Sequence, residues 1–124
     1  MMSSSKHGMI GSKATMGEIT KFFINLMDRK FSDAERAIKS VEEKPFDDEE
    51  FKKGYLTALE GILLSSRSGD SRDFLNRASF DPKSMKKYRR DFNAFIKNGI
   101  HTLFDVGYFS AWSDFLQHRL NSGS

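Results

Sequence analysis

Apolar side chains recur every three to four positions along most of the chain, a spacing that predicts amphipathic helices. The first such segment covers residues 18–29, and its apolar stripe consists of Ile19, Phe22, Phe23, Leu26 and Met27. The opening sixteen residues and the final four lack this period. We therefore expect flexible tails over 1–16 and 121–124, on either side of one helical domain over 17–120.

The next two helices are predicted from their boundary signals. Ser32 and Glu35 have the spacing of a capping box, in which each side chain bonds the other residue's backbone amide, so a helix should start at Ser32. Pro45 should end it. The acidic run 47–50 then suits the N-terminus of a helix over 47–66, where the helix dipole favours negative charge.

Two glycines interrupt this third helix. Gly54 and Gly61 lie seven residues apart and therefore near one face. Each glycine destabilises a helix by up to about 1 kcal/mol relative to alanine. We expect that each one marks a close crossing with a neighbouring helix.

The second half of the chain contains two further long helices. A short helix is expected around 74–75, and Asp81 followed by Pro82 is a typical helix start. This helix should run to about Lys97, with a cap at 98–99, before a last helix over 100–120. No long stretch alternates with period two, so the predicted class is all-α: a compact bundle of five or six helices, or repeat-like helical hairpins.

A faint internal repeat accompanies this pattern. Phe-Asp-x-x-x-Phe-Lys-Lys at 46–53 returns 34 residues later as Phe-Asp-x-x-x-Met-Lys-Lys at 80–87. This period, and the segment 30–34 followed by Val41 and Pro45, resemble tetratricopeptide repeats. The resemblance implies stacked helical hairpins over about a third of the chain. The stretch Gly-Tyr-Leu-Thr-Ala-Leu-Glu-Gly at 54–61 is similar to small archaeal helical proteins of unknown function, which implies no activity.

Composition narrows the chemistry that is available. The chain has 124 residues, the size of one domain, and no cysteine. Disulfides, thiol catalysis, iron–sulfur clusters and cysteine-ligated zinc are therefore excluded. No apolar run approaches the roughly 18 residues that span a bilayer, and residues 1–17 lack the apolar centre of a secretory signal. We expect a cytoplasmic protein.

Histidine–carboxylate pairs are the nearest approach to a catalytic or metal site. His101 and Asp105, and likewise Asp114 and His118, are four residues apart and could share a helix face. Such a pair can orient a general base or supply two metal ligands. Neither pair has a third ligand at a recognisable spacing, and no established catalytic motif occurs. We therefore predict no catalytic residue, no metal site, no cofactor and no enzyme.

A basic stripe is the first candidate binding surface. The net charge is +3, and residues 61–124 carry ten Lys or Arg against six Asp. Lys83, Lys87, Arg90 and Lys97 share one face of the predicted helix from Pro82, and Lys86 and Arg89 flank them. The opposite face would carry Met85, Tyr88, Phe92, Phe95 and Ile96. An aligned array of cations is what phosphate binding requires, although any surface helix has a charged face.

The last helix is the second candidate surface. Its apolar side chains cover roughly two-thirds of the circumference, which is wider than the stripe of a surface helix. It is therefore either the central helix of the fold or half of a homodimer interface. In the second case Phe109, Trp112 and Leu116 would form an exposed apolar patch.

The sequence favours a non-enzymatic binding module that contacts a protein partner, or a second copy of itself, through its helical surface. The alternative is a nucleic-acid-binding or other polyanion-binding accessory protein that uses Lys83, Lys86, Lys87, Arg90 and Lys97. A membrane partner is not expected.

Overall fold

The computed structural model describes residues 13–68, 81–98 and 102–123, and this part of the chain is almost entirely helical. The all-α prediction is confirmed, since the described residues contain five helices and no strand. The helices are α2 (Lys13–Met27), α3 (Phe31–Glu42), α4 (Glu49–Ser68), α6 (Pro82–Asn98) and α7 (Leu103–Gly123).

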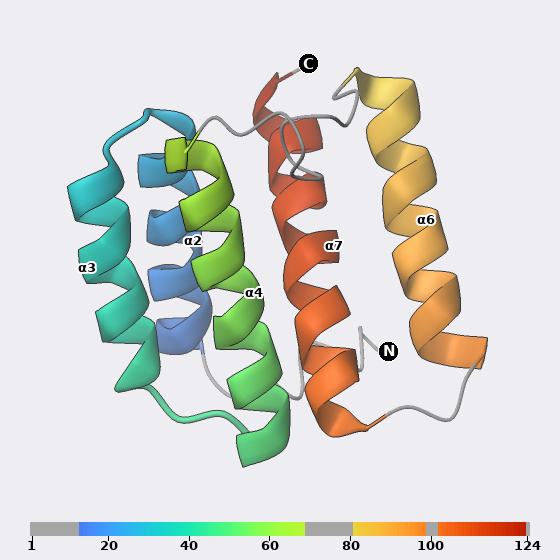
Figure 1. Cartoon of the computed structure of the whole chain (residues 1–124), viewed down its shortest axis with the longest axis horizontal. Coiled ribbons are helices and arrows are strands. Elements are labelled where there is room, and N and C mark those ends of the chain that lie inside the picture. Colours follow the sequence, from blue (N-terminus) through green and yellow to red (C-terminus); the bar gives the residue numbers. More distant parts are fainter. Residues whose placement is uncertain (1–12, 69–80, 99–101, 124) are drawn as a thin grey trace.

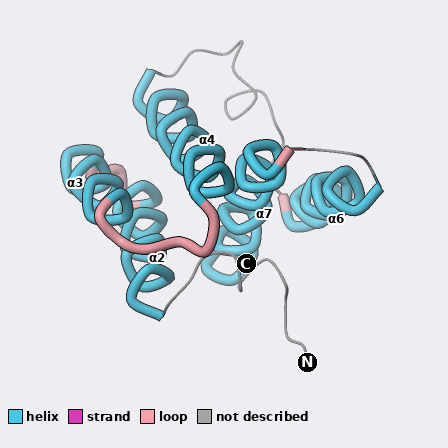
Figure 2. The backbone as a smooth tube through the Cα atoms, turned by 90° about the horizontal axis from the view of Figure 1, so that it is seen from below, coloured by secondary structure: helices cyan, strands magenta, loops and turns pink. Residues whose placement is uncertain are grey.

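The helices form a bundle with α6 at one edge. Figure 1 shows α7 between α4 and α6, and the end-on view in Figure 2 places α2 and α3 on the far side of α4 from α6. The α2 helix also reaches α7, because the Phe23 and Phe115 rings lie 5.8 Å apart. Helices α2, α4 and α6 therefore all contact α7, α4 and α6 most extensively, whereas α6 packs mainly against α7 alone.

Side-chain caps fix the starts of α4 and α6. The Phe51 amide donates to Asp48 Oδ1 at 2.9 Å, and the Ser84 amide donates to Asp81 Oδ2 at 3.2 Å. Both bonds satisfy an amide that has no partner inside the helix. The predicted start at Asp81 is confirmed, and α4 begins two residues later than expected because Asp48 provides the cap.

The predicted capping box at Ser32 is wrong. The cap position of α3 is Lys30, which makes no side-chain capping bond, and the helix begins at Phe31. A tight turn sets this register: the Lys30 amide donates to the Asn25 carbonyl at 2.8 Å, and Arg29 adopts a left-handed backbone with φ 60°. Phe31 packs against the core at the start of the helix. Tertiary packing has moved the start by one residue.

Other boundaries shift for similar local reasons. The α2 helix starts at Lys13 rather than 18, and buried Thr15 anchors its first turn by donating to the Pro45 carbonyl at 3.0 Å. The α7 helix starts at Leu103, since Thr102 accepts a bond from the Asp105 amide at 3.1 Å. Helix therefore covers 13–16 and 121–123, parts of the two predicted tails. The predictions for 1–12, 74–75 and residue 99 lie outside the described residues.

The α7 helix is the centre of the fold rather than an exposed interface. Ala111 and Leu116 are fully buried, Phe115 is 1% exposed and Trp112 is 8% exposed. The interface alternative required Trp112 and Leu116 at the surface, and the structure contradicts it at these two positions. Phe109 is half-buried. Trp112 and Leu116 are buried because α6 covers the side of α7 that would otherwise be open. The sequence does not reveal where α6 lies.

The two glycines of α4 have opposite environments. A Cβ atom on Gly54 would overlap the Phe104 carbonyl, so α4 and α7 cross closely there, as predicted. Gly107 of α7 meets the Phe51 backbone in the same way. Gly61 is exposed, with no atom within 4 Å of an added Cβ, and the predicted second crossing is wrong. At Gly61, seven residues after Gly54, the surface of α4 no longer faces α7.

Candidate anion-binding groove

Helix α6 uses one face to join the bundle. Met85 is buried, Tyr88 and Phe92 are half-buried against the core, and the Phe92 ring lies 5.6 Å from that of Phe109. Phe95 is 43% exposed, which corrects the prediction that it faces inward, although its ring stays 4.6 Å from that of Phe109. This aromatic contact aligns α6 along one side of α7.

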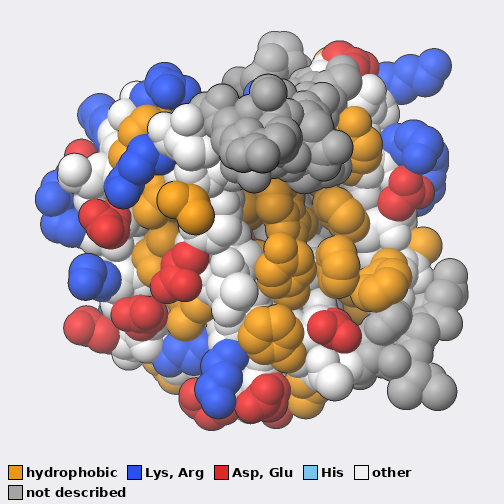
Figure 3. Space-filling model, in the orientation of Figure 1, with side chains coloured by type: hydrophobic (Ala, Val, Ile, Leu, Met, Phe, Trp, Pro, Cys, Tyr) orange, Lys and Arg blue, Asp and Glu red, His pale blue; other side chains and the backbone are white. Residues whose placement is uncertain are grey.

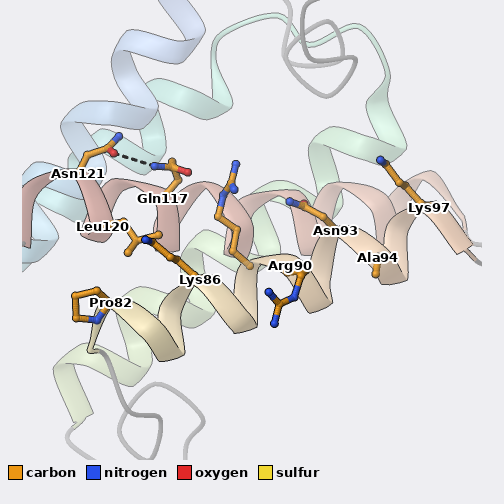
Figure 4. Close-up of a pocket in the computed structure, with 10 residues that line it drawn as sticks. Pro82, Lys86, Arg90, Asn93, Ala94, Lys97, Gln117, Leu120 and Asn121 are labelled. Carbon is orange, nitrogen blue, oxygen red and sulfur yellow. Dashed lines mark hydrogen bonds between the residues drawn. The ribbon is translucent and has the colours of Figure 1, made fainter.

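A groove of about 750 Å³ opens along another side of the α6–α7 pair. Figure 4 shows both helices contributing to it. Four cationic side chains of α6 line the groove, namely Lys86, Arg89, Arg90 and Lys97. The other described residues of its lining are amide-bearing or apolar, and none of these is a carboxylate. The groove is therefore a concave surface with charge of one sign.

The four cations of the groove are not neutralised within the described part of the chain. None of them forms an ion pair there, and the buried Nε of Arg89 has no hydrogen-bond partner among the described residues. A cleft lined by charge of one sign concentrates the electrostatic field and attracts counter-ions. An anion is the ligand that this electrostatic arrangement favours.

The groove selects only part of the predicted basic stripe. Arg90 and Lys97 of the stripe come together in it with Lys86 and Arg89, the two residues that were expected to flank the stripe. Lys83 and Lys87 lie outside its lining, and Lys87 Nζ pairs with Asp91 Oδ2 at 2.9 Å. The cations that line the groove also have helical spacing, so the sequence does contain a signal for this face of the helix. What the sequence lacks is the position of α7, which decides which of two adjoining faces becomes concave.

Three amide side chains line the groove together with the cations. Gln117 and Asn121 lie one turn apart on α7, and Gln117 Nε2 donates to Asn121 Oδ1 at 2.8 Å (Figure 4). Asn93 projects from α6, and its Oδ1 accepts a hydrogen bond from Ser113 Oγ at 3.1 Å. The sequence alone does not indicate these three residues, because isolated Asn and Gln residues form no motif.

Of the two histidine–carboxylate pairs, only Asp114 and His118 both lie within the described residues. Asp114 Oδ2 accepts a 2.7 Å hydrogen bond from the hydroxyl of buried Tyr55, and the His118 ring lies 5.5 Å from the Phe23 ring. Burial lowers the pKa of His118. The described residues contain no group of three His, Asp or Glu side chains able to hold a metal ion. His101 lies outside them.

Two other surfaces lack the single-sign character of the groove. A hollow of about 290 Å³ between α3 and α4 mixes Glu35, Glu42 and Glu60 with Lys39 and Arg67. Figure 3 shows hydrophobic side chains gathered between the α4 and α6 sides of the molecule. In this view the second surface is mainly hydrophobic rather than charged.

Comparison with known proteins gives no family assignment: no family model, no characterised protein and no solved structure matches the chain. The resemblances to tetratricopeptide hairpins and to archaeal helical proteins stay predictions. Within the described residues, no helix is both long enough and apolar enough to cross a membrane.

Proposed function

We propose that this chain is a binding protein for a phosphate-bearing polyanion, namely nucleic acid, and that the ligand lies in the groove between α6 and α7. The observation that carries the proposal is the lining of this groove, whose described residues include four cations and no carboxylate. Among the described residues of the lining there is also no imidazole, so they lack the side chains most used for acid–base catalysis. A binding role suits it better than a catalytic one.

The cations are spaced to follow a charged backbone. Lys86 and Lys97 are eleven residues apart on α6, which corresponds to about 17 Å along the helix axis. Arg89 and Arg90 lie between them. An array of this length can contact several phosphates at once, and each contact releases condensed counter-ions and so adds to the affinity.

We propose polyanion binding in place of the protein-contact module that the sequence favours. Of the three side chains expected at a protein interface, Trp112 and Leu116 are buried within the chain and only Phe109 is partly accessible. The cations of the groove are open to a ligand, since Lys86, Arg90 and Lys97 are exposed.

Titration with a fluorescent single-stranded RNA tests the proposal. An oligonucleotide of about 12 nucleotides suits the usual site sizes of single-strand binders. The test variant is Lys86→Gln with Arg90→Gln, which removes two groove cations. Its matched control is Lys83→Gln with Lys87→Gln, which removes the same charge from the same helix outside the groove lining.

The groove variant should bind at least tenfold more weakly, while the control changes less than threefold. The slope of log affinity against log salt should fall by about 1.4 in magnitude, because each phosphate contact on a single strand contributes about 0.7. Absence of binding by the unmodified protein at low salt would refute the proposal. Equal losses in the two variants would refute the groove as its location.

A further inference from the structure

The amide side chains of the groove indicate more about the chemistry of its ligand than the cations do. Phosphate oxygens only accept hydrogen bonds, so a site for phosphate alone requires donors only. The lining of the groove supplies both donors and an acceptor, because it includes Asn93, Gln117 and Asn121. A ligand that uses all these groups must itself present donors as well as acceptors.

Two hydrogen bonds hold these amides in defined orientations. Asn121 Oδ1 accepts from Gln117 Nε2, and this bond leaves Gln117 Oε1 available to a ligand as an acceptor and Asn121 Nδ2 as a donor, beside the second N–H of Gln117 Nε2. On the facing helix, Asn93 Oδ1 accepts from Ser113 Oγ, which leaves Asn93 Nδ2 as a donor. The groove therefore offers an acceptor beside a donor on α7 and a further donor on α6.

This pattern is complementary to the edge of a nucleobase. Asn and Gln amides recognise bases by pairing one donor and one acceptor with adjacent atoms of the base edge. The volume of about 750 Å³ falls within the range of about 300–1,000 Å³ that holds nucleotide-sized ligands. Leu120 and Pro82 add apolar surface at the same end of α6 and α7, where the flat face of a base can rest.

Resting on the proposed function, we infer that the ligand is a single strand, with one unpaired base bonded by Gln117 and Asn121 and a neighbouring base contacted by Asn93 (Figure 4), while the cations of α6 hold its phosphates. Bases in a duplex have paired edges and cannot enter a groove between two packed helices. Gln117 is half-buried on the α7 side of this groove, so only a base that has left a stack reaches it.

The test compares three probes on one set of variants. The probes are a single-stranded RNA, the same RNA annealed to its complement, and heparin, which is a polyanion without bases. The variants are Gln117→Met, which removes the amide and keeps the chain length, and Asn93→Ala. Asn25→Ala on α2 is the control, since Asn25 lies outside the groove.

We expect the single strand to bind the unmodified protein at least tenfold more tightly than the duplex. Both groove variants should lose about fivefold to 100-fold in affinity for the single strand, as for other lost base contacts. Their affinity for heparin should stay within twofold, and Asn25→Ala should change neither affinity.

Three outcomes would overturn the inference and still leave polyanion binding in place. These are equal affinity for single strand and duplex, full affinity for the single strand in both groove variants, and a parallel loss of RNA and heparin binding. The last would mean that the amides only support the shape of the groove. Failure of the unmodified protein to bind any of the three probes would instead refute the proposed function itself.

Discussion

Gly54 of α4 and Gly107 of α7 form a reciprocal close contact between the two central helices. A Cβ on Gly54 would overlap the Phe104 carbonyl of α7, and a Cβ on Gly107 would overlap the Phe51 carbonyl of α4. Each glycine thus provides space for the other helix's backbone. This contact holds α7 against α4, and α7 in turn forms one wall of the groove.

Alanine at either position should destabilise the protein. The neighbouring atoms are backbone, which cannot rotate away, so the two helices must separate. We expect Gly54→Ala and Gly107→Ala each to lower the free energy of unfolding by about 1–3 kcal/mol, the usual range for overpacking. Urea denaturation measures this change, and an unchanged midpoint for both variants would show that the crossing is looser than described.

Gly61 supplies the opposite case on the same helix. It is exposed and an added Cβ meets no atom within 4 Å, so only the helix propensity changes. Gly61→Ala should raise the free energy of unfolding by up to about 1 kcal/mol. A lower midpoint in the same urea experiment would contradict the open environment of this residue.

The hydrogen bond from Tyr55 to Asp114 should contribute measurably to stability. Tyr55 is fully buried and its hydroxyl donates to Asp114 Oδ2 at 2.7 Å. Tyr55→Phe should lower the free energy of unfolding by about 1–2 kcal/mol, since hydrogen bonds to charged groups are the stronger ones. Half-buried Tyr108 is the control, and Tyr108→Phe should change the stability by less than about 0.5 kcal/mol.

The same tyrosine should make stability fall at alkaline pH. Burial, together with the charge and hydrogen bond of Asp114, raises the pKa of Tyr55 well above 10.0. Above pH 10 the unfolded chain loses this proton while the folded chain retains it, so stability declines as pH rises. Urea midpoints between pH 8 and about 11 should decline less steeply for Tyr55→Phe. Parallel curves for the variant and the unmodified protein would contradict the assignment.

Trp112 should tolerate no charge, because it is 8% exposed and lies on the central helix. Trp112→Glu places a carboxylate in the core, where unpaired charge is strongly unfavourable, and should abolish cooperative thermal unfolding followed by circular dichroism. The control Leu64→Glu makes a similar change at a side chain that is 66% exposed, and it should stay folded. A folded Trp112→Glu protein with half the sedimenting mass of the unmodified protein would restore the dimer alternative.

The sequence alone determined the helical class and the places of most helices. Apolar residues at helical spacing are a local property, and the Asp81–Pro82 start acts within one turn, so neither depends on distant residues. The helix starts that were wrong reflect tertiary contacts. Phe31 packs on the core one residue before the capping box, and Thr15 bonds the Pro45 carbonyl thirty residues away.

Only the tertiary structure decided which surfaces are available to a ligand. Gly54 and Gly61 are the same type of residue, so the sequence does not reveal that Gly54 meets a helix and Gly61 meets solvent. Likewise, the sequence placed cations around much of α6, but the position of α7 selects Lys86, Arg90 and Lys97 for the groove and adds the amide of Gln117. Helical period depends on neighbours along the chain, whereas a groove depends on how two helices pack, and this is set by contacts between residues far apart in sequence.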